Sequence, residues 1–339
     1  MRIERLPDGP SAEFSAALGA FEAQFRYPLG GGRWFRIDHG QDYGRFFASI
    51  GDARTWIAES QAQVVGAISA ARVELRVPSG ESHSAAYFGD FKVRLADPQR
   101  SAGWVAAGLL RRAADWAQSY TRRGMAIVMD GTAVVPENYT GRLGLPPFRS
   151  IGHVTIWRIE PPAMSTVPRE VSEIPTSELG DHFRRLTAGG YILEHPRTLP
   201  SPSREAAPSR EERSKMRPRA WLLDGGRACG LLEDTRLAKR LYLDDGAELV
   251  SGHLSCLAFQ DPRAAIDVIR AALSECASQG IPGLFMALPD RRAELLSASP
   301  EWQEWTAAWP RDAVMSTGAS IWGSGLESGF DWYLHTAEI

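Results

Sequence analysis

One loop in the first half of the chain carries the residue types that bind a phosphate group. The segment from Lys92 to Ala117 starts with the end of an apolar strand, passes through small residues, and continues as a helix near Gly103. Backbone N–H groups converge at a helix N-terminus, and the helix dipole adds to their attraction for an anion. Arg94 and Arg100 are placed to add charge-assisted hydrogen bonds. The loop has neither the P-loop pattern nor the dinucleotide-binding glycine pattern, which disfavours both of those protein classes.

Two carboxylates next to apolar strands are candidate general bases. Asp90 lies within the strand that leads to the loop, and Asp130 follows the apolar strand Met125–Met129. An ionised carboxylate is rarely buried without a partner, so each position needs an explanation. Catalysis is one explanation, and pairing with a nearby arginine or capping of a turn is the other. The lone histidines His39 and His153 are more typical of structural positions.

The elements that would position these residues occur twice along the chain. The segments that begin at Arg2 and Arg169 each have a short apolar strand, a proline and a helix start. Those that begin at Arg54 and Arg219 each have Arg-x-Trp, a strand, a turn and a second strand with a glycine. The first pair of arginines is 167 residues apart and the second pair is 165 apart. This near-constant offset indicates an internal repeat.

Each copy continues with a strand, an amphipathic helix and a buried strand. Both helices carry apolar residues on one face: Val105, Leu109, Ala113 and Trp116 in the first copy, and Ile266, Ile269, Leu273 and Cys276 in the second. Final strands are predicted at His153–Ile159 and Gly329–Thr336. This order of elements predicts an α/β fold, with a mixed sheet and a central parallel βαβ crossover in each copy.

A polar, proline-rich stretch separates the copies. We expect domains at residues 1–160 and 169–339, joined by a linker at 161–168. A second stretch rich in proline and serine, residues 195–218, lies inside the second copy. It is either a solvated loop or a lid over a site.

Composition and charge exclude several classes of protein. The chain has 339 residues, 44% hydrophobic and 23% charged, as in globular proteins and unlike disordered, collagen-like or coiled-coil chains. Its net charge of −3 argues against a nucleic-acid binder. The three cysteines have no disulfide or metal-site spacing, the N-terminus has no signal core, and no apolar stretch approaches the ~20 residues of a membrane span. We therefore expect a cytoplasmic protein without a metal.

The order of elements and the loop together resemble the GNAT superfamily of acyl-CoA transferases. The signature of that family, Q/R-x-x-G-x-G/A, lies between its fourth strand and third helix, where this chain has RSAGWV. The arginine and the first glycine match, and Val105 stands where the family has glycine or alanine. The resemblance covers the whole chain as two tandem copies. It implies that the pyrophosphate of an acyl-CoA rests on the N–H groups of Arg100, Ser101, Ala102, Gly103, Trp104, Val105 and Ala106.

The resemblance also implies how the donor is held and activated. The pantetheine arm pairs like an extra strand with the backbone of Phe91–Leu95, which includes Val93, Arg94 and Leu95. The N–H of Val93 polarises the thioester carbonyl. An amine then attacks this carbonyl directly, and a base removes the proton of the amine.

Three further residues take roles from the same resemblance. Tyr139 is the candidate acid that protonates the departing thiolate. It lies one residue further from the following turn than in the family, and a packing role is the alternative. Asn138 is a candidate cofactor contact. Asp130 ends the strand at which the sheet of the family opens to admit the thioester.

The second copy departs from the signature. Its corresponding stretch, Leu257–Ile269, has a shorter loop without the glycine, and Asp261 would repel phosphates. We expect this copy to be degenerate, with one active site in residues 1–160 and the second copy as a partner or acceptor-binding wall. The aromatic segment Phe25–Phe47 falls where the acceptor-binding helices of the family lie, and it either lines a slot or packs on the sheet. Trp302, Trp305 and Trp309 fall on one face of a predicted helix. We expect this face to be part of the core or to line an apolar groove.

These observations predict an acyl-CoA-dependent N-acyltransferase. It would move an acetyl group, the commonest donor group of the family, to an amine of a small molecule or peptide in a ternary complex. One alternative is transfer of a longer fatty acyl chain, because tandem GNAT-like folds include N-myristoyltransferase-like enzymes. Another is a non-catalytic CoA-sensing or scaffold protein, which Val105 and the displaced Tyr139 favour.

Overall fold

The computed structural model describes residues 1–7, 10–94, 102–142, 145–160, 168–194 and 210–339. Among these residues, no helix is both long and apolar enough to cross a membrane. The elements of the first copy are β1 (Arg2–Arg5), α1 (Ala12–Glu22), β2 (Tyr27–Gly30), β3 (Arg33–Asp38), α2 (Arg45–Ala48), β4 (Asp52–Ser60), β5 (Gln63–Arg76), β6 (Ser82–Val93), α3 (Ala102–Gln118), β7 (Gly124–Met129) and β8 (Arg149–Ile159).

The second copy repeats this order with small additions. Its elements are β9 (Val171–Ile174), α4 (Thr176–Leu186), β10 (Tyr191–Glu194), α5 (Arg210–Arg213), β11 (Arg219–Leu223), β12 (Ala228–Glu233), β13 (Arg240–Leu243), β14 (Gly252–Phe259), α6 (Pro262–Ser278), β15 (Leu284–Pro289), α7 (Asp290–Ser297), α8 (Pro300–Thr306), β16 (Val314–Ser324) and β17 (Trp332–Tyr333). The predicted mixed α/β architecture with two tandem copies is therefore confirmed.

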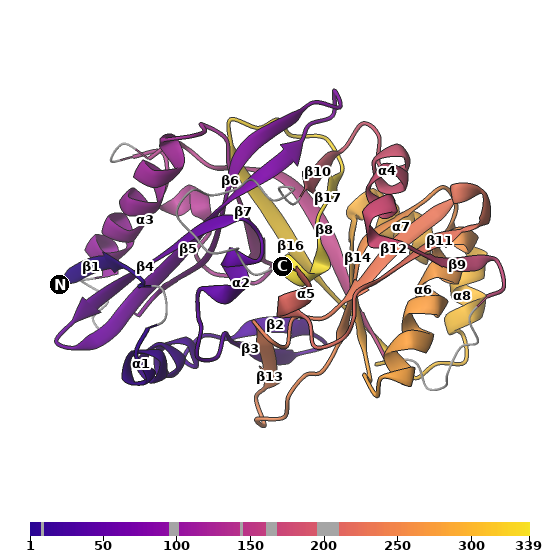
Figure 1. The fold of residues 1–339 in the computed structure, drawn as a ribbon, viewed down its shortest axis with the longest axis horizontal. Coiled ribbons are helices and arrows are strands. Elements are labelled where there is room, and N and C mark those ends of the chain that lie inside the picture. The colour runs from indigo at the N-terminus through magenta and orange to yellow at the C-terminus, as the bar shows by residue number, and fades with distance from the viewer. Residues whose placement is uncertain (8–9, 95–101, 143–144, 161–167, 195–209) are drawn as a thin grey trace.

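The two copies share one continuous sheet because they exchange their last strands. Its order is β1-β4-β5-β6-β7-β16-β8-β15-β14-β12-β11-β9. The last strand of the second copy, β16, lies between β7 and β8 of the first copy, and β8 in turn pairs with β15 of the second. Figure 1 shows β16 in yellow among the purple and magenta strands of the first copy. A smaller sheet, β13-β3-β2, joins the copies a second time.

The closing strand of the second copy is not where the sequence predicted it. Val314–Ser324 forms that strand, whereas only Trp332–Tyr333 is extended within the predicted Gly329–Thr336. The segment Val314–Ser324 is rich in serine and glycine, so it has little of the apolar alternation by which a strand is recognised.

The central helices form as their apolar faces predict. The face of α3 is buried on β4 and β5, where Gly66 lets Val105 and Leu109 approach the strand closely. A Cβ added at Gly66 would lie only 2.8 Å from Leu109 Cδ1 and 2.9 Å from Val105 Cγ1. In the second copy, Gly230 likewise lets Val268 of α6 approach the strand closely. The side chain of Asp261 accepts a hydrogen bond from the N–H of Ala264 at 3.0 Å and caps α6.

A bulge splits the sheet at the same place in each copy. Asp90 on β6 and Cys256 on β14 have φ angles of 55° and 53°. Each lies at a one-residue bulge, Asp90 in the pairing of β6 with β5 and Cys256 in the pairing of β14 with β12. Beyond Phe88, β6 no longer pairs with β7. Beyond Leu254, β14 likewise no longer pairs with β15. Each copy therefore has a split between its two parallel strands.

Candidate active site

A large cavity opens at the split between β6 and β7. Its volume is about 920 Å³, within the range of ligand sites in proteins. One part lies under α3, next to Gly103, Ala106 and Leu110, and another part reaches the aromatic residues Tyr27 and Phe46. Aromatic and aliphatic side chains make up most of its wall. The second copy adds Lys239, Ser324, Glu338 and Ile339 to the lining.

The predicted cofactor-binding residues have different positions around this cavity. Val93, Gly103 and Ala106 line it, and α3 begins at Ala102. Trp104 is 76% exposed and does not line the cavity. Val105 is buried against β5 and faces away from the cavity, which explains why a residue larger than glycine or alanine is tolerated there. Two further predicted contacts lie elsewhere, and the others, Leu95, Arg100 and Ser101, fall outside the described residues.

The two contacts that lie elsewhere are Arg94 and Asn138. The guanidinium of Arg94 donates a hydrogen bond to Gln63 Oε1 at 3.2 Å. The Asn138 side chain is exposed, and its Oδ1 accepts a hydrogen bond from the N–H of Val135 at 2.9 Å. Both side chains therefore contact neighbouring parts of the chain and are not part of the cavity wall.

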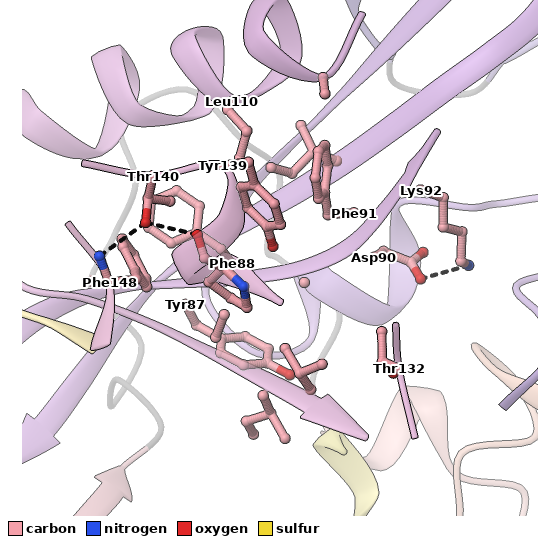
Figure 2. Close-up of a pocket in the computed structure, with 18 of the residues that line it drawn as sticks. Tyr87, Phe88, Asp90, Phe91, Lys92, Leu110, Thr132, Tyr139, Thr140 and Phe148 are labelled. Carbon is pink, nitrogen blue, oxygen red and sulfur yellow. Dashed lines mark hydrogen bonds and ion pairs between the residues drawn. The ribbon is translucent and has the colours of Figure 1, made fainter. Parts of the chain in front are cut away.

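Tyr139 lies in the wall of the cavity, on the α3 side of β6. Its ring centre is 5.1 Å from that of Phe91, a residue beyond the last β6–β7 pair. Figure 2 shows the two rings side by side above the split, with the Tyr139 hydroxyl pointing toward it. Burial raises the pKa of Tyr139 above its ordinary value, so the phenol remains protonated near neutral pH.

Asp130 lies outside the cavity wall. Its carboxylate is 2.8 Å from His153 Nε2, and the other ring nitrogen of His153 is 2.8 Å from Asp290. Burial lowers the pKa of His153, but the hydrogen bonds that its ring donates to Asp290 and Asp130 outweigh burial and raise the pKa above its ordinary value. Asp130 therefore belongs to a partly exposed ion-pair cluster at the junction of the two copies.

Asp90 belongs to a buried group of four charged or polar side chains. Lys92 Nζ lies 2.6 Å from Asp90 Oδ1 and 2.7 Å from Glu22 Oε1. His39 Nδ1 lies 2.7 Å from Glu22 Oε1 and 3.5 Å from Asp90 Oδ2. None of the four side chains is more than 6% exposed. Glu22 comes from the end of α1, His39 from the segment after β3, and the other two from β6.

The electrostatics of this group follow from its burial and pairing. Burial raises the pKa of Asp90, but the charge of Lys92, joined by that of His39 when its ring is protonated, outweighs burial and holds the pKa well below its usual range. Burial likewise raises the pKa of Glu22, and His39 and Lys92 again bring it below the ordinary value. Both carboxylates are therefore ionised at neutral pH. Figure 2 shows the Asp90–Lys92 pair at the edge of the cavity.

The buried group also has the donor set of a metal site, since oxygen and nitrogen atoms of Glu22, His39 and Asp90 lie within 4.8 Å of one another. However, the ammonium group of Lys92 is already within 2.7 Å of both carboxylates. A second cation there would be repelled by Lys92. The cluster is therefore suited to hold protons and charge and is not suited to hold a metal ion.

Comparison with known proteins bears on the fold. No protein-family model and no curated protein matches the sequence. The N-myristoyltransferase of Saccharomyces cerevisiae, solved with bound myristoyl-CoA, superposes with a TM-score of 0.59 and 10% identity over 99% of this chain and 87% of that chain. A tandem GNAT protein from the clavulanic acid biosynthesis pathway superposes with a TM-score of 0.50 and 11% identity over 95% of this chain and 98% of that chain. This chain has the tandem GNAT fold.

In this chain, the second split is filled by the chain itself. The Thr336 hydroxyl donates a hydrogen bond to the carbonyl oxygen of Leu254 at 3.1 Å and accepts one from the N–H of Ala287 at 3.0 Å. These two strands part at this point, so Thr336 bridges the opening. Next to it, His335 Nδ1 lies 3.3 Å from Cys256 Sγ on the bulge. In the first copy, the corresponding opening is part of the cavity.

Proposed function

We propose that this protein is an acyl-CoA-dependent N-acyltransferase with one active site, in the first copy. The observation that carries the proposal is the open split between β6 and β7, which leads from the N-terminus of α3 to a buried set of ionised groups. The filled split of the second copy supports a single site, because Thr336 bridges the strands where a pantetheine arm would pass.

Each part of the site has a role in the proposed reaction. The backbone at the start of α3, together with the loop before it, holds the pyrophosphate. The pantetheine arm pairs with the edge of β6 beyond Phe88, which β7 leaves unpaired. The amine attacks the thioester carbonyl, whose oxygen a β6 N–H polarises, and Tyr139 gives a proton to the departing thiolate. The residues of the second copy that line the cavity form part of the acceptor side.

The cavity favours an acyl group longer than the acetyl group predicted from the sequence. Its volume is about 920 Å³ and its wall is mainly aromatic and aliphatic, a surface that stabilises a hydrocarbon chain. Each CH₂ group buried there contributes about 0.8 kcal/mol, or about a fourfold gain in affinity. An acetyl group would contact less of this apolar wall than a longer acyl chain would.

The proposal is tested by binding and turnover with a series of donors. Calorimetric titrations with acetyl-, hexanoyl-, decanoyl- and myristoyl-CoA should each give one site per chain, with affinity rising along the series. Incubation of each donor with a panel of primary amines and amino-terminal peptides should release free CoA, measured as thiol. Equal affinities along the series would contradict the preference for a longer acyl group and would leave acetyl-CoA as the expected donor. Binding without release of thiol by any amine would favour a CoA-sensing protein, and no binding at all would refute the proposal.

A further inference from the structure

We infer that His39 is the general base that takes a proton from the attacking amine, and that Glu22 orients it. This inference rests on the proposed function and assigns a residue to its proton-transfer step. It concerns a histidine that the sequence pattern favoured as structural. Three observations carry it: the contacts that orient the ring, the position of its free nitrogen, and an unpaired carboxylate oxygen beside it.

One carboxylate orients both the ring and the backbone of His39. Glu22 Oε1 lies 2.7 Å from His39 Nδ1, and Glu22 Oε2 accepts the backbone N–H of His39 at 2.9 Å. Glu22 is ionised, so it accepts hydrogen bonds and donates none. Nδ1 must therefore carry the proton, and in the neutral ring Nε2 has the lone pair.

The remaining nitrogen of the ring is available to a ligand. His39 lines the cavity, and none of the residues that the structure describes hydrogen-bonds to its Nε2. Aromatic rings flank the imidazole, with ring centres at 4.8 Å for Tyr43 and 5.7 Å for Phe46. These neighbours fix the plane of the ring and leave Nε2 as its available acceptor.

Beside the ring, Asp90 presents a buried oxygen that lacks a hydrogen bond. Asp90 Oδ1 is paired with Lys92, whereas Oδ2 has no described partner at full hydrogen-bond geometry, and the Tyr43 hydroxyl is a weaker neighbour of the same carboxylate. This oxygen lies 3.5 Å from His39 Nδ1, and Asp90 lines the same cavity. An N–H of the acceptor amine would satisfy Oδ2 and so hold the amine in the part of the cavity that Asp90 and His39 both line. Asp90 is itself too weak a base, because Lys92 and His39 keep its pKa well below the usual range.

The proton and electron movements balance without another reactant. The protonated amine gives one proton to His39 Nε2, and Glu22 and Asp90 stabilise the imidazolium that results. The amine lone pair then forms the C–N bond to the thioester carbon, and the C–S bond breaks as its electrons move to sulfur. The thiolate takes a proton from Tyr139, and the second proton of the nitrogen replaces it. The net products are the amide, CoA thiol and the proton held by His39.

The main test compares His39→Gln with the wild-type chain, using myristoyl-CoA and the amine of the panel that is acylated fastest. We expect kcat to fall at least 100-fold while the affinity for myristoyl-CoA stays within twofold, since a general base contributes about 10²–10⁴. The charged and titratable groups around the ring are Glu22 of α1, Asp90 and Lys92 of β6, and the Tyr43 hydroxyl. His83→Gln, which changes a histidine at the outer end of β6, is the matched control.

Two further experiments separate a chemical role from a structural one. Imidazole added to His39→Ala should restore part of the rate in proportion to its concentration. Two-bond ¹H–¹⁵N spectra of the histidine-labelled wild type, assigned with His39→Gln, should show His39 protonated at Nδ1 and unprotonated at Nε2. A His39→Gln rate within threefold of the wild type, or a proton on Nε2, would overturn the inference while the proposed function stands. A wild type that binds myristoyl-CoA but acylates no amine would overturn the proposed function and the inference with it.

Discussion

Asp90 shows how a single residue connects the fold to the site. Its left-handed backbone creates the bulge at which β6 parts from β7, and its side chain pairs with Lys92 at the edge of the resulting cavity. A non-glycine residue in this conformation costs about 1–3 kcal/mol, which the surrounding sheet must offset. Cys256 has the same conformation in the second copy, where Thr336 closes the split. The bulge therefore persists where the site does not.

Replacement of Tyr139 tests the acid of the proposed reaction. Tyr139→Phe removes the phenolic proton and keeps the ring that packs on Phe91, so we expect kcat to fall by about 100-fold with unchanged affinity for acyl-CoA. Pre-steady-state release of thiol measures the chemical step directly. Tyr120→Phe, a half-buried tyrosine outside the cavity wall, is the control. An unchanged chemical step would assign Tyr139 to packing.

Replacement of Lys92 tests the charge balance of the buried group. Lys92→Met leaves two ionised carboxylates buried without their cation, so we expect a loss of about 3–5 kcal/mol in the free energy of unfolding at pH 7. In the wild type, the lowered pKa of Asp90 contributes stability above the unfolded pKa of about 3.9, and this contribution is lost as pH falls. In Lys92→Met, burial raises the pKa of these carboxylates without the opposing charge of Lys92, so the native variant takes up protons between pH 7 and pH 4 and the stability difference between the two chains should shrink over that range.

Urea titrations at the two pH values measure this difference. Lys215→Met, which removes an exposed ammonium group, is the control and should change stability little at either pH. A difference that is equal at pH 7 and pH 4 would show that Lys92 acts through packing and not through its charge.

Sequence reasoning reached some of these residues and missed others for a physical reason. Asp90 was recognisable because a carboxylate in an apolar strand needs a partner. Its neighbours Glu22 and His39 come from a helix end and a loop about 50 to 70 residues earlier, and nothing in their local pattern distinguishes them. The pair Asp90 and Lys92 carried a usable signal, because residues two apart in a strand share one face.

Helix α3 is the element on which the proposed donor binding depends most directly. A Cβ added at Gly103 would meet no atom of the described residues within 4 Å, so this position has room for the pyrophosphate that the proposed function places there. The departure of Val105 from the GNAT signature also has a structural cause, since that side chain is buried on β5. The residue that faces the cavity from the following position is Ala106.

Substitution of Gly103 separates charge from size at the start of α3. Gly103→Asp should weaken acyl-CoA binding about 100-fold or more, because a like charge beside the phosphates costs several kcal/mol. Gly103→Ala should keep wild-type affinity, since its methyl group enters open space. Calorimetry gives both affinities, and thermal melting verifies that both chains fold. Normal binding by Gly103→Asp would place the phosphates elsewhere.

The apolar patterns predicted most elements but not how the last strands pair. The helix faces of α3 and α6 and the strands on either side of them were evident from their periodicity. By contrast, β16 lacks apolar alternation, so its sequence does not identify it as a strand. Its sequence also does not indicate which copy supplies its two neighbours, which are β7 and β8 in the structure. Strand exchange is decided by the whole sheet and not by local preference.

At the level of the whole molecule, the two copies are joined by paired strands and not only by their linker. We therefore expect that a protease site introduced between Glu160 and Pro168 can be cut without separating the halves, because β16 remains between β7 and β8. Gel filtration of the cut chain should give one peak, with myristoyl-CoA affinity within twofold of the uncut chain. Two separate peaks without denaturant would show that the exchanged strands contribute little to association.

The exchanged strand also determines when this protein can fold during its synthesis. Ile159, the end of β8, precedes Val314, the start of β16, by 155 residues. At translation rates of about 5–20 residues per second, the first copy waits roughly 8 to 30 s for the strand that completes it. Throughout that time β7 and β8 expose unpaired edges, a known route to aggregation. A nascent chain of this protein should therefore depend on chaperones until Val314–Ser324 emerges, and chains that stop before Val314 should accumulate as aggregates.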